Sequence, residues 1–311
     1  MSNTQLLLFS GFISYISTRF LIKPLKKLSP DVPNERSSHK KITPRGGGIA
    51  IIISSSIFFT ILGQYEFLYL SLLSLTCFLD DIKPINIKYK FFSQLITVFI
   101  LFYNSNIKSN LFQSNGIYLD ILFLILLIFL GCTIINFSNF VDGIDGLLCS
   151  EMIIILIFSS TVISSSIIPL LGSIIGFLIW NWNPAKIFLG DVGSNYLGGY
   201  LVYILFNTTS IIGSLNLLIL CSPILFDCSF CIVRRFLKKE NIFEAHSLHL
   251  FQRLVKAGWK HSMVSVIYAL LVALIGFSWL WGGLKWELIS SLGTLFTLVL
   301  LDKFYAEEFK V

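Results

Sequence analysis

Acidic and carboxamide side chains interrupt long apolar runs at several points of this 311-residue chain. The densest group separates an apolar run ending at residue 135 from another beginning at residue 147, and it reads Asn136-Phe-Ser-Asn139-Phe-Val-Asp142-Gly-Ile-Asp145-Gly146. An Asp at membrane depth costs about 2.5–3.5 kcal/mol on insertion scales. Such a group therefore indicates a functional site. The alternative is a solvated loop whose Asp and Asn residues cap the next helix.

Similar polar groups occur elsewhere in the chain. They are Ser38-His39 with Thr43-Pro44-Arg45-Gly46-Gly47-Gly48, Asp80-Asp81, Lys88 with Lys90, Phe188-Leu-Gly-Asp191-Val-Gly-Ser194, and Glu244-Ala-His246-Ser-Leu-His249-Leu-Phe-Gln-Arg253. Hard oxygen ligands suit Mg²⁺, which proteins hold by one or two carboxylates together with substrate phosphates. Lys and Arg suit phosphate oxygens. Beside a membrane-embedded acceptor, this set of side chains predicts phosphoryl or sugar-phosphate transfer to a lipid.

Each group also has a purely structural interpretation. The backbone N–H groups of Gly46, Gly47 and Gly48 are suited to approach an anion at the start of a helix, but three small residues also let helices pack closely. Asp80 and Asp81 are compatible with capping a loop, and His246 and His249 with a solvated loop. The elements that carry these residues decide between the interpretations.

The composition indicates an all-α integral membrane protein. Hydrophobic residues make up 55% of the chain, charged residues 13%, and the mean hydropathy is +0.81. The apolar runs are continuous, whereas barrel strands alternate over about ten residues. The net charge of +6 indicates membrane topology, and no nucleic-acid partner is expected. The six cysteines lie in or beside apolar runs, so we predict packing thiols, including Cys228 and Cys231 despite their metal-like spacing.

The apolar runs predict a polytopic helical bundle of about eleven transmembrane helices, with ten as the alternative, in one domain covering residues 1–311. The first run is interpreted as a retained span over residues 4–22. Span nine (211–232) should be kinked at Pro223, and spans ten and eleven cover 262–281 and 286–301. Lys and Arg place the N-terminus outside and the C-terminus in the cytoplasm. All the polar groups then lie in cytoplasmic loops, namely 23–45, 80–90, 136–146, 181–195 and 234–261.

These ordered motifs resemble the polyprenyl-phosphate N-acetylhexosamine-1-phosphate transferases, glycosyltransferase family 4. The matching pieces are Ser38-His39 with Thr43 to Gly48, Phe78-Leu-Asp80-Asp81, Lys90-Phe-Phe-Ser-Gln94, Asn136 to Gly146, Phe188 to Ser194, and His246-Ser-Leu-His249. The resemblance implies a membrane phosphotransferase with its active site on the cytoplasmic face. It also implies Mg²⁺ as cofactor, with Mn²⁺ as the alternative, and a bacterial inner-membrane location.

The resemblance also implies roles for individual residues. Asp191 would ligate the metal with Asn139, and Asp80 would be the general base toward the lipid phosphate, with Asp81 beside it shaping charge and metal placement. Asn136, Asp142 and Asp145 would line the nucleotide and metal pocket, Lys90 and Arg45 would contact substrate, and His246, His249 and Arg253 would hold the diphosphate or the sugar. Among these, we expect Asp80, Asp81, Asp142 and His249 to be catalytic. Asp142 is also the natural candidate for an aspartyl nucleophile, although a one-step attack asks less of the protein.

The spacing His246-x-x-His249 resembles the O-antigen branch of the family rather than the pentapeptide transferases, where three adjacent histidines are typical. The expected reaction transfers GlcNAc-1-phosphate, or a related 6-deoxy-N-acetylhexosamine-1-phosphate, from a UDP-sugar to undecaprenyl phosphate and releases UMP. This is the first membrane step of O-antigen or other cell-surface polysaccharide synthesis. The alternatives are a phospho-N-acetylmuramoyl-pentapeptide transferase and, from another class, a transporter with an anion site at its inner mouth. Expected partners are the UDP-N-acetyl sugar, the polyprenyl phosphate, membrane lipid and a second copy in a homodimer. The role of Asp227, inside a predicted span, stays open.

Overall fold

The computed structural model describes residues 1–33, 41–111, 116–163, 166–241, 244 and 246–309. Ser38 and His39 of the first motif lie outside these residues. The elements in chain order are α1 (Asn3–Leu28), β1 (Pro30–Asp31), β2 (Thr43–Pro44), α2 (Gly48–Ile61), the 3₁₀ helix η1 (Glu66–Leu70), α3 (Ser71–Ile82), α4 (Ile87–Tyr103), α5 (Asn106–Leu111), α6 (Ile117–Val141), α7 (Leu147–Ser159), α8 (Ile168–Asn181), α9 (Gly190–Phe206), α10 (Ile211–Leu220), α11 (Ser222–Leu237), α12 (Leu250–Lys256) and α13 (His261–Phe304).

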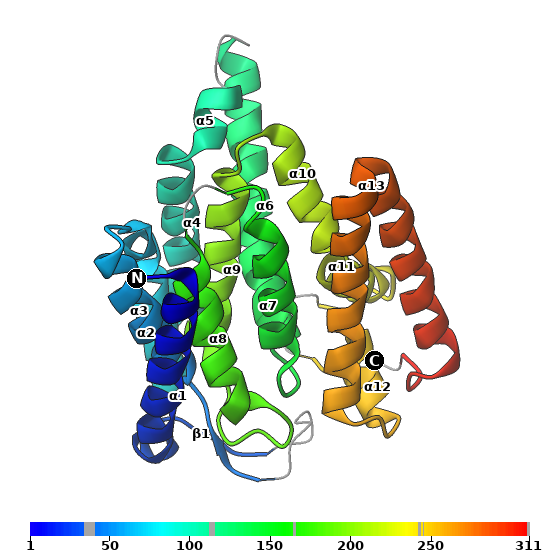
Figure 1. The fold of residues 1–311 in the computed structure, drawn as a ribbon. Helices are drawn as coiled ribbons and strands as arrows, with labels where there is room; N and C mark the ends of the chain where they lie inside the picture. The colour runs from blue at the N-terminus through cyan, green and yellow to red at the C-terminus, as the bar shows by residue number, and fades with distance from the viewer. Residues whose placement is uncertain (34–40, 112–115, 164–165, 242–243, 245, 310–311) are drawn as a thin grey trace.

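The helices form a bundle with α1, α2 and α3 on one side and α13 on the other (Figure 1). Within the described residues, α1, α6 and α13 are long and apolar enough to cross a membrane, and the bent pair α10 and α11 passes the same test as one unit. The shorter helices α2, α7 and α8 are also apolar. The strands β1 and β2 form one short antiparallel pair, with Pro30 opposite Pro44. The all-helical membrane fold is confirmed, and the count of eleven spans stays a prediction.

Helix α9 is the centre of the bundle. Every residue from Val192 to Phe206 is buried, and the helix packs against α2, α3, α4, α6 and α10. Buried polar residues of α9 such as Asn195 need partners from these neighbouring helices, because neither lipid nor water reaches them. The first turn of α9 carries Asp191, so this buried helix fixes the position of that carboxylate relative to the helices around it.

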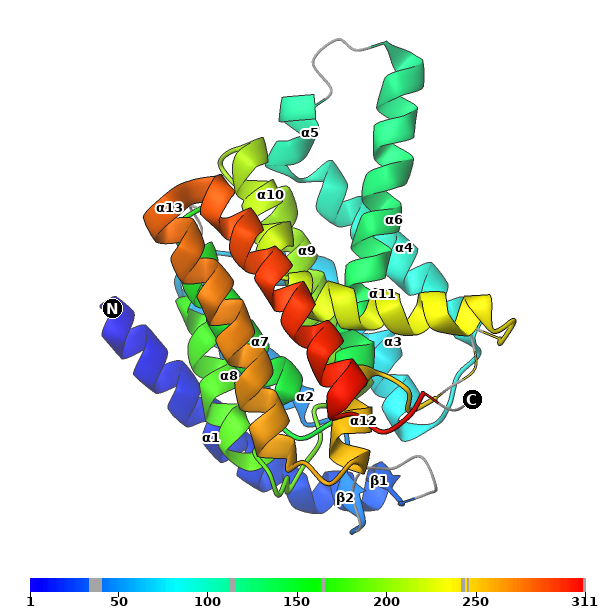
Figure 2. The ribbon, with the colours of Figure 1, turned by 90° about the vertical axis from the view of Figure 1, so that its right-hand side faces the viewer.

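Two predicted spans differ in detail from the structure. Span nine is two helices, α10 and α11, bent by 63°. Pro223 lies in the first turn of α11 rather than within a continuous helix, because its missing N–H is tolerated there. Spans ten and eleven are the two arms of α13, which fold into a hairpin (Figure 2). The chain reverses at Gly283, whose φ of 65° is a conformation that favours glycine.

Several residues predicted in loops lie in helices instead. The predicted loop 80–90 contains the ends of α3 and α4, and the predicted loop 136–146 contains the last turns of α6. Helix α1 likewise continues to Leu28, past its predicted end at residue 22. The polar side chains at these positions form hydrogen bonds with neighbouring helix ends. The backbone can therefore stay helical through these positions. β1, α12 and the connection between α8 and α9 gather at the lower end in Figure 1.

Candidate active site

Asp191 is the point at which four elements meet. Its Oδ1 lies 3.2 Å from Nη2 of Arg45 and accepts a hydrogen bond from Nδ2 of Asn139 at 3.1 Å. Its other oxygen accepts a hydrogen bond from Nζ of Lys90. These partners come from the segment before α2, from α4 and from the last turn of α6. The predicted metal ligand is therefore held by two cations and one amide.

Asp81 caps the N-terminus of α9. Its oxygens accept hydrogen bonds from the backbone N–H groups of Asp191 and Val192, each at 3.0 Å, and Nε of Arg45 lies 3.1 Å from Oδ1. The close approach requires Gly190, because a Cβ at that position would lie 2.7 Å from Oδ2 of Asp81, and its φ is +76°. The Asp81 side chain is fully buried, so it orients Asp191 through the backbone.

Asp80 lies beside Asp81 in α3 but faces a different environment. Its Oδ2 accepts a hydrogen bond from Nζ of Lys90 at 3.0 Å, and its Oδ1 accepts one from the backbone N–H of Ile85 at 2.9 Å. The side chain is 20% exposed, unlike that of Asp81. Lys90 therefore bridges Asp80 and Asp191, and of the two neighbouring carboxylates Asp80 is the one open to solvent.

Asp142 lies just past the end of α6 and is partly buried. Burial raises the pKa of Asp142 well above its usual value, the charges of Asp191 and Asp81 raise it further, and Arg45 opposes the shift. The site thus contains four carboxylates (Asp80, Asp81, Asp142 and Asp191) and two cations (Arg45 and Lys90). When all are ionised, four negative and two positive charges leave a net charge of −2, which one divalent cation would balance.

The donor set therefore fits a hard divalent ion such as Mg²⁺, because carboxylate oxygens dominate it. Asp191 is suited to hold such an ion. Asn139 is next to it, but its amide nitrogen faces Asp191 and also donates to Oγ of Ser194 at 2.9 Å. To bind the same ion as Asp191, Asn139 would have to turn its amide oxygen toward it. A 180° rotation of the amide group, which exchanges oxygen and nitrogen, would achieve this.

Asn136 belongs to a network of amides between α4, α6 and α9. Its Nδ2 donates to Oε1 of Gln94 at 3.2 Å, and Nε2 of Gln94 donates to Oδ1 of Asn195 at 3.1 Å. Asn195 in turn donates to the backbone carbonyl of Asp191 at 2.8 Å. Asn136 is thus connected to the backbone of Asp191 through the hydrogen bonds of Gln94 and Asn195.

Asp145 joins three segments of the chain. It accepts hydrogen bonds from Nδ2 of Asn183 at 2.8 Å and from the backbone N–H of Ala185 at 3.1 Å, and Nδ1 of His261 lies 3.4 Å away. Burial would raise the pKa of Asp145, but these partners outweigh it and hold the pKa below its usual value. Asp145 therefore fixes the connection after α8 to the start of α13.

Two of the three backbone N–H groups of the glycine triplet are already hydrogen-bonded within the protein. The N–H groups of Gly47 and Gly48 donate to the carbonyls of Phe188 and Leu189 at 2.9 and 2.8 Å. A Cβ on Gly48 would lie 2.2 Å from Cα of Gly193, so this glycine lets α2 and α9 pack closely. The interpretation of these two N–H groups as phosphate ligands is wrong, because the segment before α9 already uses them.

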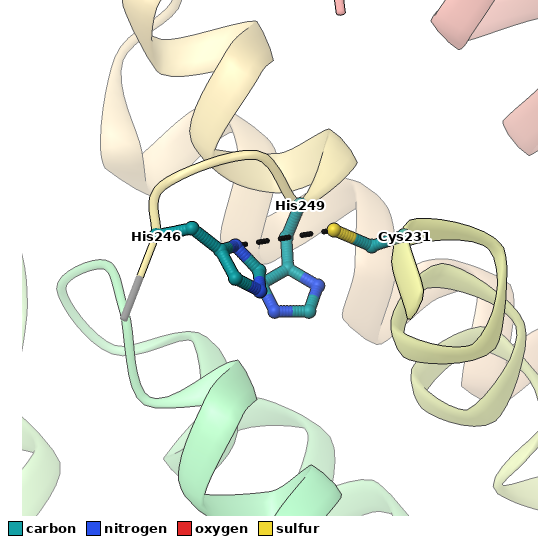
Figure 3. A group of neighbouring side chains, drawn as sticks. All are labelled: Cys231, His246 and His249. Atoms are coloured by element: carbon teal, nitrogen blue, oxygen red, sulfur yellow. Dashed lines mark hydrogen bonds between the residues drawn. The ribbon is translucent and has the colours of Figure 1, made fainter. Parts of the chain in front are cut away.

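The two histidines of the last motif lie apart from Asp191, beside Cys231 of α11 (Figure 3). Burial lowers the pKa of each imidazole to about 4, so both are neutral near pH 7. The interpretation of Cys231 as a plain packing thiol is incomplete, since its Sγ lies 4.0 Å from Nδ1 of His246. Sequence spacing did not reveal this, because the partners are separated by a helix end and a loop.

Asp227 is a residue whose role the sequence left open, and it caps α12. Its Oδ1 accepts a hydrogen bond from the N–H of Leu250 at 2.8 Å, and its Oδ2 from the N–H of Phe251 at 3.2 Å and from Oη of Tyr268 at 2.6 Å. A carboxylate at a helix N-terminus satisfies N–H groups that lack helical partners. Asp227 thereby fixes the end of the histidine loop to α11.

Arg253 is buried and tied to the end of α13. It pairs with Asp302, and its Nη1 donates to the carbonyl of Glu307 at 2.7 Å. Its Nε donates to the carbonyl of Leu248 at 3.2 Å. Within the described residues these contacts are structural ones, and they stabilise the turn that presents His249.

The histidine group and the carboxylate group meet at the end of α6. The ring of Phe140, the residue after Asn139, lies 5.8 Å from the ring of His249. A Cβ on Gly143 would lie 2.8 Å from Nε2 of Gln252 in α12. These contacts connect the carboxylate group to the histidine group at the end of α6.

The fold and the site together define a multi-pass helical membrane protein with a charged carboxylate centre at one end. Residues 64–209 match the family model of glycosyl transferase family 4. A probable undecaprenyl-phosphate N-acetylglucosaminyl 1-phosphate transferase of Bacillus subtilis is 31% identical, over 86% of this chain and 81% of that protein. An undecaprenyl-phosphate alpha-N-acetylglucosaminyl 1-phosphate transferase of Thermotoga maritima is 32% identical, over 87% of this chain and 89% of its own length.

A phospho-N-acetylmuramoyl-pentapeptide-transferase of Staphylococcus carnosus is similar at 27% identity, over 87% of this chain and 96% of that protein. The chain belongs to glycosyl transferase family 4, the family that the motifs predicted.

Proposed function

We propose that this chain transfers an N-acetylhexosamine-1-phosphate group, in the first place GlcNAc-1-phosphate, from a UDP-sugar to undecaprenyl phosphate. The activities named for the Bacillus and Thermotoga relatives support the choice of lipid and sugar. The observation that carries the proposal is the convergence of Arg45, Lys90 and Asn139 on Asp191, because phosphate groups need both cations and a metal-binding carboxylate.

The proposed reaction is a single displacement. A phosphate oxygen of the lipid attacks the phosphorus that carries the sugar, and a new phosphorus–oxygen bond forms. The bond from that phosphorus to the bridging oxygen breaks, and UMP leaves with that oxygen and the electron pair. Asp80, the more exposed of the two adjacent carboxylates, takes the last proton of the lipid phosphate, while Lys90 and Arg45 offset the phosphate charge.

Mg²⁺ at Asp191, with Mn²⁺ as the alternative, would neutralise the charge that develops on the leaving phosphate. Asn139 and Asp142 are the side chains near enough in the site to share that ion or the nucleotide. We propose the one-step route over an aspartyl intermediate, because the lipid phosphate is itself a nucleophile and asks less of the protein.

The proposal places the reaction on the cytoplasmic face of a bacterial inner membrane, with the N-terminus outside and the C-terminus inside. His246 and His249 would contact the diphosphate or the sugar, and Phe140 is the link between them and Asn139. The homodimer stays a prediction, which size measurement of the purified protein in detergent can test.

The experiment is a donor panel with purified protein and undecaprenyl phosphate. UMP release is measured with UDP-GlcNAc, UDP-GalNAc, UDP-QuiNAc, UDP-FucNAc and UDP-MurNAc-pentapeptide, each with Mg²⁺ and with chelator. We expect the highest rate with UDP-GlcNAc and no release in chelator. Release with the pentapeptide donor alone would replace the proposal with the alternative transferase, and no release with any donor would contradict it.

A further inference from the structure

Cys231 in α11 faces the two imidazoles of the loop before α12. Its Sγ lies 4.0 Å from Nδ1 of His246, and the rings of His246 and His249 are 4.9 Å apart between centroids. One ligand atom from each of the three residues lies within 4.8 Å of the other two. The three side chains turn toward one another from two different elements (Figure 3).

His249 has an unsatisfied nitrogen in this cluster. The residue is 3% exposed, and its Nδ1 has no hydrogen-bond partner. A buried polar atom without a partner costs about 1–3 kcal/mol, so a ligand bound to this nitrogen would remove that cost. The rings of Phe140 and Phe251 lie 5.8 and 5.4 Å from the imidazole and hold it in place.

We propose that Cys231, His246 and His249 bind a thiophilic divalent cation such as Zn²⁺, at a site separate from the carboxylate centre around Asp191. One sulfur and two imidazole nitrogens are ligands that select Zn²⁺ over Mg²⁺, in contrast to the oxygen donors of the carboxylate centre. Three protein ligands leave a fourth tetrahedral position for water.

The Cys231 thiol and Asp227 supply the negative charge nearest to such an ion. The Cys231 thiol loses its proton to solvent when the metal–sulfur bond forms. The thiolate and Asp227, whose Oδ1 lies 3.9 Å from Nδ1 of His249, then carry two negative charges against the two positive charges of the ion. Arg253 and Arg234 share the single carboxylate of Asp302, and Arg235 donates to backbone carbonyls, so the positive charge of Arg235 opposes the binding of a cation. The ion would join α11 to the histidine loop.

The test uses Co²⁺ as an optical substitute for Zn²⁺ on the purified chain in detergent. We expect Co²⁺ to give a thiolate-to-metal charge-transfer band that Zn²⁺ abolishes and that excess Mg²⁺ leaves unchanged. Cys231→Ser should remove the band. Loss of an outer partner alone weakens metal sites by roughly 10–100-fold, and loss of the thiolate should weaken Co²⁺ binding at least as much.

The matched control is Cys228→Ser, one turn earlier in α11. Cys228 is equally buried, but its Sγ faces the carbonyl of Phe137 at 3.9 Å, so the band should remain. His246→Gln, at a half-buried position, should weaken Co²⁺ binding even where the cysteine variant proves unstable. Absence of the band in the unchanged chain, or its persistence in Cys231→Ser, overturns the proposal. The readout needs no substrate, so its failure is distinct from failure of the proposed transferase activity.

Discussion

Replacing Asp81 with asparagine removes one of the two acceptors at the start of α9. The carboxylate accepts the N–H groups of Asp191 and Val192, each at 3.0 Å, and it pairs with Arg45. An asparagine offers one acceptor oxygen, and its NH₂ group would face the second N–H. One backbone donor would then lose its partner, and Arg45 would lose one of its two carboxylate partners while keeping Asp191.

The size of the effect follows from burial. A buried donor left without a partner costs about 1–3 kcal/mol, and a lost hydrogen bond to a charged group about 1.5–3 kcal/mol. The Asp81 side chain is 0% exposed, so water cannot replace the lost acceptor. We expect Asp81→Asn to lower the free energy of unfolding by about 3 kcal/mol. Asp80→Asn, whose side chain is 20% exposed, should lower it by about 1 kcal/mol or less.

The assay is unfolding of each variant by SDS titration in mixed micelles, followed by tryptophan fluorescence, with UMP release measured on the same samples. Asp80→Asn should fold like the wild type and lose turnover, because we propose that Asp80 is the general base. Asp81→Asn should be clearly destabilised. An Asp81→Asn variant within about 0.5 kcal/mol of the wild type, the range of an ordinary surface change, would refute the capping role.

Three further predictions concern neighbouring groups. Asp142→Asn should raise the melting temperature in metal-free buffer. Burial raises the pKa of Asp142, so above the pKa that this group has in the unfolded chain its ionised form destabilises the folded state. An unchanged or lower melting temperature contradicts this. Asp227→Asn should speed hydrogen–deuterium exchange at the N-terminus of α12, whereas Tyr268→Phe, which keeps both amide contacts, should not; equal exchange in both variants would exclude the cap. Folding lowers the pKa of His246 and of His249 from 6.5 to about 4. Between these two pH values the unfolded chain binds protons that the folded chain does not bind. The free energy of unfolding should therefore fall as the pH drops from about 6.5 toward 4. Replacing both histidines with glutamine should flatten that pH dependence, and an identical slope would disprove the assignment.

The sequence predicted the membrane fold and the meeting of the polar motifs because both depend on simple patterns. Continuous apolar runs suit lipid, and runs that alternate in direction place residues such as Asp80 and Asp191 on the same side of the membrane. The break before Pro223 and the reversal of α13 at Gly283 also follow from local backbone rules, because Pro is tolerated in the first turn of a helix and Gly allows a positive φ. Helix ends were harder to predict from the sequence, because polar residues such as Asn139 stay helical when a neighbouring helix supplies hydrogen-bond partners.

The contacts that divide the site into two clusters were beyond the reach of spacing alone. Nothing in the local sequence pairs Cys231 with His246, or Arg253 with Asp302, because these contacts depend on how α11, α12 and α13 pack. The use of the Gly47 and Gly48 N–H groups by the segment before α9 is of the same kind. Such long-range pairs appear only when the helices are placed in space.

The most direct measurement of the central claim compares UMP release by Asp191→Ala with that by Asp120→Ala, which removes a carboxylate at the opposite end of α6 from Asn139. With UDP-GlcNAc, undecaprenyl phosphate and Mg²⁺, we expect the unchanged chain and Asp120→Ala to release UMP at similar rates. Asp191→Ala should lose activity by about two orders of magnitude or more, as expected when a carboxylate that holds the metal and the cations is removed. Turnover by Asp191→Ala close to that of the unchanged chain would contradict the account.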